Sequence, residues 1–241
     1  PKDVAVISAA SAFKAGGGGG SDNYASVPSG PMTRWDLTQL HPFQNTVVAL
    51  EITGAQLKEW LEMSASSFNQ VVPDVIEAEL KRPDFPCYGF DVVFGVTSAI
   101  DLTQPAKYNV LGKVVEDANR IVDLRYCGTP VSDNQTFIML TTSYRAGGGG
   151  NFPSVQNCRH VDIPSKDSRE LLADFIASNP TSDQIPPSPW RFKPIQDAKV
   201  TRMIGQGVLP YFAQGHRPEI EITAGQVDPY GFVPFTINLD S

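Results

Sequence analysis

Histidine is scarce in this 241-residue chain, which contains only His41, His160 and His216. A hydrolytic centre with two metal ions needs several histidine and aspartate ligands that converge on the metals. The sequence has no Asp-x-His, Gly-Asn-His or His-x-His spacing, and it has no Gly-x-Ser-x-Gly nucleophile elbow. It therefore predicts neither a metal site nor a catalytic residue in this chain.

Cysteine is also sparse, with Cys87, Cys127 and Cys158 widely separated and no Cys-x-x-Cys motif. That spacing argues against a zinc ribbon or a redox-active pair. Two arrangements stay open, either one disulfide with a free thiol or three buried thiols, so the cysteines do not decide the cellular compartment.

Long apolar runs are absent, and a chain without a stretch of 18 apolar residues is predicted not to span a membrane. The formal net charge is −7, and an acidic surface repels phosphate backbones, so nucleic acid is an unfavourable partner. A small anionic ligand is still compatible with a local cluster of cations. The sequence shows no signal-peptide pattern, and Pro1 to Asp3 lead directly into an apolar stretch. We therefore expect that the chain is entered in the middle of a longer protein.

Glycine, by contrast, is abundant, with two runs at 16–20 and 147–150. A phosphate-binding Walker loop needs a lysine directly after its last glycine, and neither run has one. The first run therefore predicts a flexible or tightly turning loop. The second run lies beside Tyr144 and Phe152, which predicts a close approach of the backbone to a flat ligand.

Hydrophobic patterning mixes helices and strands without a regular βαβ alternation, which predicts an α+β fold with a mixed sheet packed with helices. Capping boxes at Thr33 and Thr53 predict helices over 33–40 and 53–66, and a third amphipathic helix is expected over 165–178. We expect one domain over 1–241, in which the proline-rich stretch 179–194 leads to a tail on the same core. Strands are expected over 4–13, 46–52, 90–96, 108–115, 120–126, 135–142 and 232–239.

Five segments in a fixed order resemble the C-terminal domain of the 5'-nucleotidase family, and the resemblance covers the chain from about residue 4 to its end. Three further segments are similar to the bacterial periplasmic branch of 2',3'-cyclic-nucleotide 2'-phosphodiesterase/3'-nucleotidases. The family segments are Leu40 to Thr46, Ile52 to Glu62, Tyr88 to Asp91, Arg120 to Gly128 and Thr142 to Gly149, and the branch segments are Ser8 to Lys14, Glu59 to Gln70 and Trp190 to Ile195.

This resemblance implies a nucleobase-binding domain of a phosphoric ester hydrolase that is inactive by itself. In the family, an N-terminal metallophosphatase domain of the same polypeptide holds two divalent metals. That domain is absent from this chain, so we expect no cofactor here. The implied ligand is a nucleotide or nucleoside, and the implied location is the periplasm or the cell surface.

The family clamps the base between two aromatic rings, and by motif these are Phe43 and Tyr144. Asn45 stands where the family places a polar base contact, and Arg145 follows the second ring. Lys14 falls where relatives carry an arginine on the phosphate or ribose side. Stacking tolerates any base, so the clamp suits an enzyme that accepts many nucleotides. Without the motifs, a lone aromatic is more often a core residue, Asn45 and Arg145 fit a turn or a surface contact equally well, and Lys14 fits a solvated lysine.

The sequence leaves other functions open. The same domain occurs in 5'-nucleotidases and UDP-sugar hydrolases, although the segments around Phe68 and Trp190 favour the cyclic-phosphodiesterase branch. A stand-alone nucleoside- or sugar-binding module is the alternative from another class. Gly89 replaces a usual asparagine and Gly150 stands where some relatives have a base-contacting aspartate, which leaves the base preference open.

Overall fold

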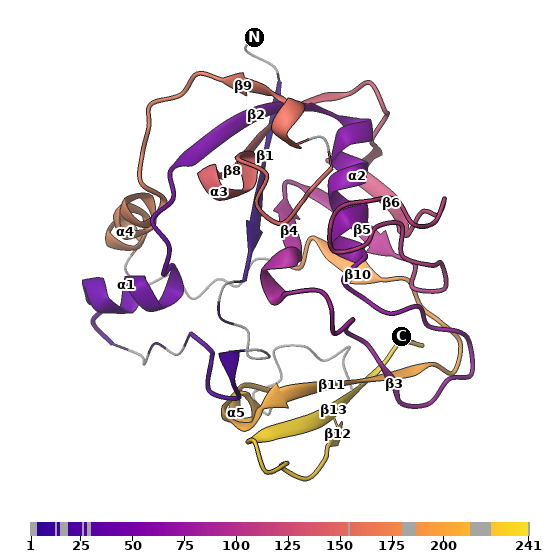
Figure 1. The fold of residues 1–241 in the computed structure, drawn as a ribbon. Helices are drawn as coiled ribbons and strands as arrows, with labels where there is room; N and C mark the ends of the chain where they lie inside the picture. The colour runs from indigo at the N-terminus through magenta and orange to yellow at the C-terminus, as the bar shows by residue number, and fades with distance from the viewer. Residues whose placement is uncertain are drawn as a thin grey trace.

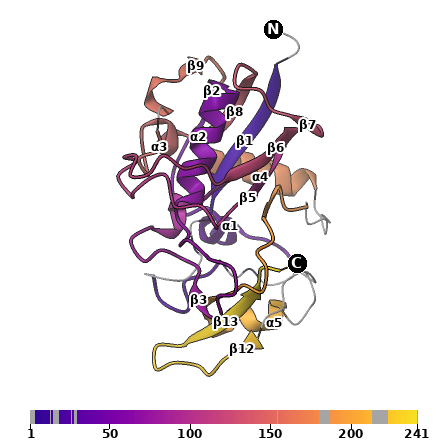
Figure 2. The same cartoon turned by 90° about the vertical axis from the view of Figure 1, so that its right-hand side faces the viewer.

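The computed structural model describes residues 4–12, 14, 19–25, 27, 30–153, 155–179, 187–212 and 223–240, and every structural statement below concerns these residues. Their fold is α+β, as the sequence predicts, with three sheets and several short helices. The third sheet lies at the opposite end of the molecule from the N-terminus (Figures 1 and 2).

The first sheet has five strands in the order β4-β1-β8-β2-β9. β1 and β8 run parallel, whereas the other neighbours are antiparallel. Its two central antiparallel strands, β2 and β8, are paired along seven residues each. The strands are β1 (Ala5–Ser11), β2 (Val47–Thr53), β4 (Asp91–Phe94), β8 (Thr136–Thr142) and β9 (Arg159–Val161).

The second and third sheets have four strands each, in the orders β10-β5-β6-β7 and β12-β13-β11-β3. In each of them one pair is parallel, β10 with β5 and β11 with β3. The second sheet comprises β5 (Val96–Ile100), β6 (Ile121–Tyr126), β7 (Thr129–Pro130) and β10 (Trp190–Phe192), and the third comprises β3 (Ala78–Glu79), β11 (Lys199–Gly205), β12 (Thr223–Ala224) and β13 (Phe232–Asn238).

Two helices begin at the capping boxes that the sequence predicts. The Thr33 and Thr53 side chains accept the backbone N–H of Asp36 and Gln56, whose side chains accept the N–H of the capping residues in return. The helices are α1 (Arg34–Leu40), α2 (Gly54–Ala65), α3 (Ser143–Ala146), α4 (Ser168–Ser178) and α5 (Leu209–Phe212), with 3-10 turns η2 (Cys87–Gly89), η3 (Val155–Asn157) and η4 (Gln206–Val208).

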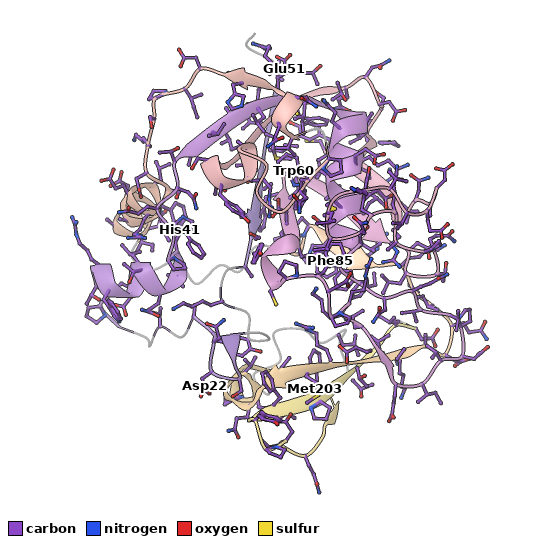
Figure 3. The ribbon with its side chains drawn as sticks, in the orientation of Figure 1. Asp22, His41, Glu51, Trp60, Phe85 and Met203 are labelled. Carbon is purple, nitrogen blue, oxygen red and sulfur yellow. The ribbon has the colours of Figure 1, made fainter. Side chains whose placement is uncertain are left out.

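The core forms around α2, which contacts β2 and β4 of the first sheet and β6 of the second. Leu57, Trp60 and Leu61 recur at helical spacing and are buried. Trp60 packs against the Phe152 ring with centroids 5.5 Å apart, in the interior of the molecule (Figure 3). The apolar face of α2 thus joins two sheets into one core.

Some expected boundaries are wrong for local reasons. The predicted strand 108–115 is a loop, because the Asn109 side chain accepts the N–H groups of Leu111 and Lys113, both at 3.0 Å, and closes a turn. The predicted strand 90–96 is divided into β4 and β5 at Gly95, where φ is 101°. The helix expected over 165–178 begins at Ser168, since Asp167 is its N-cap.

The structure also bears on the cysteine pairing and on the predicted absence of a membrane span. Cys87 is half-buried, Cys127 is exposed and Cys158 is buried, and no two of these three described residues form a disulfide. None of the helices in the described part of the chain is long and apolar enough to cross a bilayer.

Candidate functional site

The antiparallel pairing of β2 and β8 brings two of the predicted site segments together. Val47, at the start of β2, is paired with Thr142, at the end of β8. Beyond these residues the ladder continues, because Ser143 N–H donates to the Thr46 carbonyl at 2.8 Å and Thr46 N–H donates to Ser143 Oγ at 3.1 Å. Residues 43–45 and 143–145 therefore leave the same edge of the first sheet, near α3 and α1 (Figure 1).

Two aromatic side chains at this edge are exposed. Phe43 has 58% of its surface accessible and Tyr144 has 48%, so neither is a core residue. Asn45 is half-buried and connects the two segments, since Ser143 Oγ–H donates to Asn45 Oδ1 at 3.4 Å. Phe43 and Tyr144 make up the aromatic pair of this candidate site. Their role as a clamp stays a prediction at this point.

The segment that carries Phe43 is held by the first turn of α4. Ser168 donates to the Asn45 carbonyl from both its backbone N–H and its Oγ–H, each at 2.8 Å. Arg169 donates from Nε and Nη2 to the carbonyl oxygens of residues 41 and 42, at 3.1 and 3.0 Å. Residues 41–45 are thus fixed by four hydrogen bonds from two consecutive residues.

His41 completes this contact between the segment and α4. Its Nε2 lies 2.6 Å from Ser168 Oγ, and its side chain lies beside the end of α1 (Figure 3). Burial lowers the pKa of His41 below its ordinary value, the nearby Arg169 charge lowers it further, and Asp167 partly offsets both. The imidazole is therefore easier to keep neutral than a solvent-exposed histidine.

Tyr144 is held from the other side by the tetraglycine segment. Gly149 N–H donates to the Tyr144 carbonyl at 2.9 Å. A Cβ at position 149 would clash at nearly equal distances with Cδ1, Cε1 and Cζ of Tyr144, which places Gly149 over the face of the ring rather than at its rim. The sequence predicts a close backbone approach to a flat ligand here, and the flat group that the backbone approaches is the Tyr144 side chain.

Arg145 is buried, unlike its neighbour Tyr144. Its Nε and Nη2 donate to both carboxylate oxygens of Asp91, at 2.9 and 2.6 Å, and both side chains are only 3% exposed. Trp60 Nε1–H donates to the same carboxylate at 2.8 Å. The Arg145 guanidinium also lies 3.9 Å from the centroid of the Phe152 ring. In the structure Arg145 is internal, with its Cζ 5.8 Å from the centroid of the Tyr144 ring. Its predicted contact with a ligand stays a prediction.

The remaining guanidinium donors of Arg145 connect two loops. Nη2 donates to the Tyr88 carbonyl at 2.8 Å, and Nη1 donates to the Gly149 carbonyl. A Cβ at Gly150, where φ is +78°, would collide with Nη1. The glycines at 149 and 150 are therefore required by the packing of Tyr144 and Arg145.

Lys14 lies apart from this hydrogen-bond network. It is half-buried, and its Nζ donates to the side chain of Gln39 in α1. α1 immediately precedes the segment that carries Phe43, which places Lys14 on that side of the site. A phosphate or ribose contact from Lys14 stays a prediction.

Sequence reasoning missed Tyr88, Ser168 and Arg169. Tyr88 is 44% exposed, and its ring stands at 82° to the Tyr144 ring with centroids 6.4 Å apart. The sequence marks Tyr88 only as the first residue of a segment that resembles the family, and Ser168 and Arg169 only as part of a predicted helix. Their contacts join segments that are distant along the chain, so no local pattern signals them.

The described residues do not fit a metal centre. Among them, no group of three or more histidine, cysteine, aspartate or glutamate side chains is arranged to hold an ion. This edge of the sheet offers two exposed aromatic rings and a carboxamide, which suit recognition of a flat ligand with a polar rim.

The fold of most of this chain is similar to one already seen in a solved nucleotidase structure. The structure of a 5'-nucleotidase precursor from Thermus thermophilus superposes with a TM-score of 0.56 over 78% of this chain and 31% of that protein, at 20% identity. The family model for the 5'-nucleotidase C-terminal domain matches residues 3–157, and the chain belongs to this family.

Two curated relatives are similar over most of this chain. The trifunctional nucleotide phosphoesterase protein YfkN of Bacillus subtilis is 38% identical over 202 residues, which are 83% of this chain and 14% of that protein. A 2',3'-cyclic-nucleotide 2'-phosphodiesterase/3'-nucleotidase of Salmonella typhimurium is 32% identical over an alignment 249 residues long, which covers 97% of this chain and 38% of that protein. The chain thus spans well under half the length of either relative.

Proposed function

We propose that this chain is the nucleobase-binding part of a 2',3'-cyclic-nucleotide 2'-phosphodiesterase/3'-nucleotidase, and that the aromatic pair stacks on the two faces of the base. The observation that carries the proposal is the exposure of Phe43 and Tyr144 on segments that leave adjacent strands at one sheet edge. Exposed rings in an anchored backbone are suited to binding, because a core role would bury them.

Stacking accounts for broad substrate use. Each stacked base gains about 1–3 kcal/mol from an aromatic contact, whatever the base. The Asn45 side chain, next to Ser143, supplies a donor and an acceptor for the polar rim of the base. Lys14 supplies a positive charge on the α1 side for the sugar or phosphate.

The phosphoester chemistry belongs to another part of the longer polypeptide. The relatives that match this chain are named as phosphoesterases, and they extend far beyond the matched region. The proposal assigns the two divalent metals and their ligands to an N-terminal metallophosphatase domain of the same polypeptide. On this proposal the 241-residue chain binds nucleosides, hydrolyses nothing alone and acts in the periplasm or at the cell surface.

Calorimetric titration tests the binding part of this proposal. The chain is titrated with adenosine and with 3'-AMP, beside the double variant Phe43→Ala/Tyr144→Ala and the control Tyr230→Ala, whose ring is 80% exposed in a remote turn. Binding that disappears only in the double variant supports the aromatic pair. Equal binding by all three proteins would show that the base lies elsewhere.

Activity measurements test whether this chain lacks hydrolytic activity by itself, and to which branch of the family the full-length protein belongs. The purified chain with added Mn²⁺ or Co²⁺ is expected to release no phosphate from 3'-AMP, and turnover that scales with the amount of chain would refute this. For the full-length protein, we expect hydrolysis of 2',3'-cyclic AMP and 3'-AMP. Preference for 5'-AMP or a UDP-sugar would instead assign the 5'-nucleotidase branch.

A further inference from the structure

We propose that Tyr88 is a positioning residue for nucleobase binding, which acts by fixing the plane of the Tyr144 ring. This inference rests on the proposed function, because it concerns the same aromatic pair. The observation behind it is the perpendicular contact of the two rings, 82° between planes with centroids 6.4 Å apart. Such an edge-to-face arrangement is the favourable geometry for two aromatic side chains.

The backbone of Tyr88 is fixed although its ring is exposed. The Tyr88 carbonyl accepts a hydrogen bond from Arg145 Nη2 at 2.8 Å, and Arg145 is itself ion-paired with Asp91. The next residue, Gly89, is buried and donates to the Pro86 carbonyl at 3.0 Å. Tyr88 therefore presents its ring to Tyr144 from an anchored 3-10 turn.

Tyr144 meets a second constraint from Gly149, which lies over one face of its ring. A ring that has backbone against one face and an aromatic ring perpendicular to it has little freedom to rotate about χ1 and χ2. A base that stacks on a fixed ring does not lose affinity to the cost of ordering that ring. Tyr88 thus contributes to base affinity through Tyr144.

The ring of Tyr88, and not its hydroxyl, carries this role. Among the described residues, no protein group is hydrogen-bonded to the Tyr88 hydroxyl, so that its removal leaves the contact with Tyr144 intact. Tyr88→Phe therefore conserves the positioning group, whereas Tyr88→Leu removes the aromatic ring and keeps an apolar side chain.

The experiment is a double-mutant cycle in the whole chain. Adenosine binding is titrated by NMR into the millimolar range for the natural sequence, Tyr88→Phe, Tyr88→Leu, Tyr144→Leu and Tyr88→Leu/Tyr144→Leu, with Tyr230→Leu as the control. We expect Tyr88→Leu to weaken binding about two- to tenfold, Tyr88→Phe to stay within about twofold, and Tyr88→Leu to add nothing once Tyr144 is leucine. If Tyr88→Leu weakened adenosine binding by the same factor with tyrosine and with leucine at position 144, the proposal would be overturned, because Tyr88 would then act independently of Tyr144.

A second measurement needs no ligand. In protein labelled with ε-¹³C tyrosine, the Tyr144 signals, assigned with Tyr144→Phe, are expected to shift in Tyr88→Leu and to keep their positions in Tyr230→Leu. Unchanged Tyr144 signals in Tyr88→Leu would overturn the proposal whatever the binding results. Adenosine affinity that is unchanged by Tyr144→Leu would refute the proposed stacking instead, which separates the two failures.

Discussion

The Arg145 guanidinium and the Asp91 carboxylate form a buried bidentate ion pair, in which Arg145 Cζ lies 5.8 Å from the centroid of the exposed Tyr144 ring. Asp91 begins β4 and Arg145 lies in α3, so the pair connects an edge strand of the first sheet to the turn that carries the aromatic side chain. Trp60 adds a third hydrogen-bonded group from α2.

Asp91→Asn is expected to destabilise the chain by about 3–5 kcal/mol, because it leaves the Arg145 charge buried without its partner. Urea unfolding, followed by the fluorescence of the tryptophans, measures the free energy of unfolding. The matched control is Glu51→Gln, which breaks an ion pair with Arg159 on the surface and is expected to leave the curve unchanged. Equal effects of the two substitutions would contradict the buried position of Asp91.

Gly149→Ala is expected to weaken adenosine binding by about tenfold, because a methyl group at this position displaces the Tyr144 ring and removes one stacking contact. Gly207→Ala is the control, since a Cβ at Gly207 meets nothing within 4 Å. Calorimetric titration of the two variants provides the comparison. Normal affinity in Gly149→Ala would mean that the position of Tyr144 is unimportant for binding.

Arg169→Ala is expected to weaken adenosine binding about three- to tenfold, because the segment that carries Phe43 loses two hydrogen bonds and has to be ordered on binding. Arg169→Lys is expected to restore little of the lost adenosine affinity. One ammonium group does not reproduce the planar guanidinium, which donates to two carbonyl oxygens at once. The control is Arg191→Ala, which removes a surface ion pair of the second sheet. Full affinity in Arg169→Ala would show that the hydrogen bonds of Arg169 do not position Phe43 for binding.

The free energy of unfolding is expected to fall as the pH is lowered below about 6.5, in part through His41. The folded chain lowers the pKa of His41, so the unfolded chain binds the proton first, and acid favours unfolding. His41→Gln is expected to reduce the loss of stability between about pH 7.5 and about pH 5.5. His160→Gln changes an exposed histidine and is expected to keep the original loss. The urea midpoints of the natural chain and of both variants, measured at the two pH values, give the loss of stability of each protein.

The elements that the sequence predicts well are those fixed by neighbouring residues. The capping boxes at Thr33 and Thr53 involve residues three apart, and both helices begin where these motifs lie. The predicted strand at 108–115 is wrong because its apolar Leu111 and Val114 are exposed in a loop closed by Asn109. An apolar pattern alone does not reveal a side chain that captures two backbone donors.

Only part of the candidate site can be predicted from the sequence. Phe43 and Tyr144 lie in motifs, and the β2–β8 pairing brings their segments together. Arg145 has the same motif support, but its burial follows from Asp91 and Phe152, which come from other parts of the chain. The contact of Tyr88 with Tyr144 and the hydrogen bonds of Arg169 join segments distant along the chain, and for that reason the sequence does not predict them.

The hydrogen bonds of Arg145 have a consequence for how the chain unfolds. One guanidinium joins a β-strand carboxylate, the carbonyl of a 3-10 turn and the carbonyl of a glycine loop. Asp91 and Arg145 come together only when β4, β1 and β8 are paired, so the position of Tyr144 depends on strands that are distant along the chain. Along a denaturation curve, nucleoside binding and the tertiary fold are therefore expected to disappear cooperatively, in a single transition.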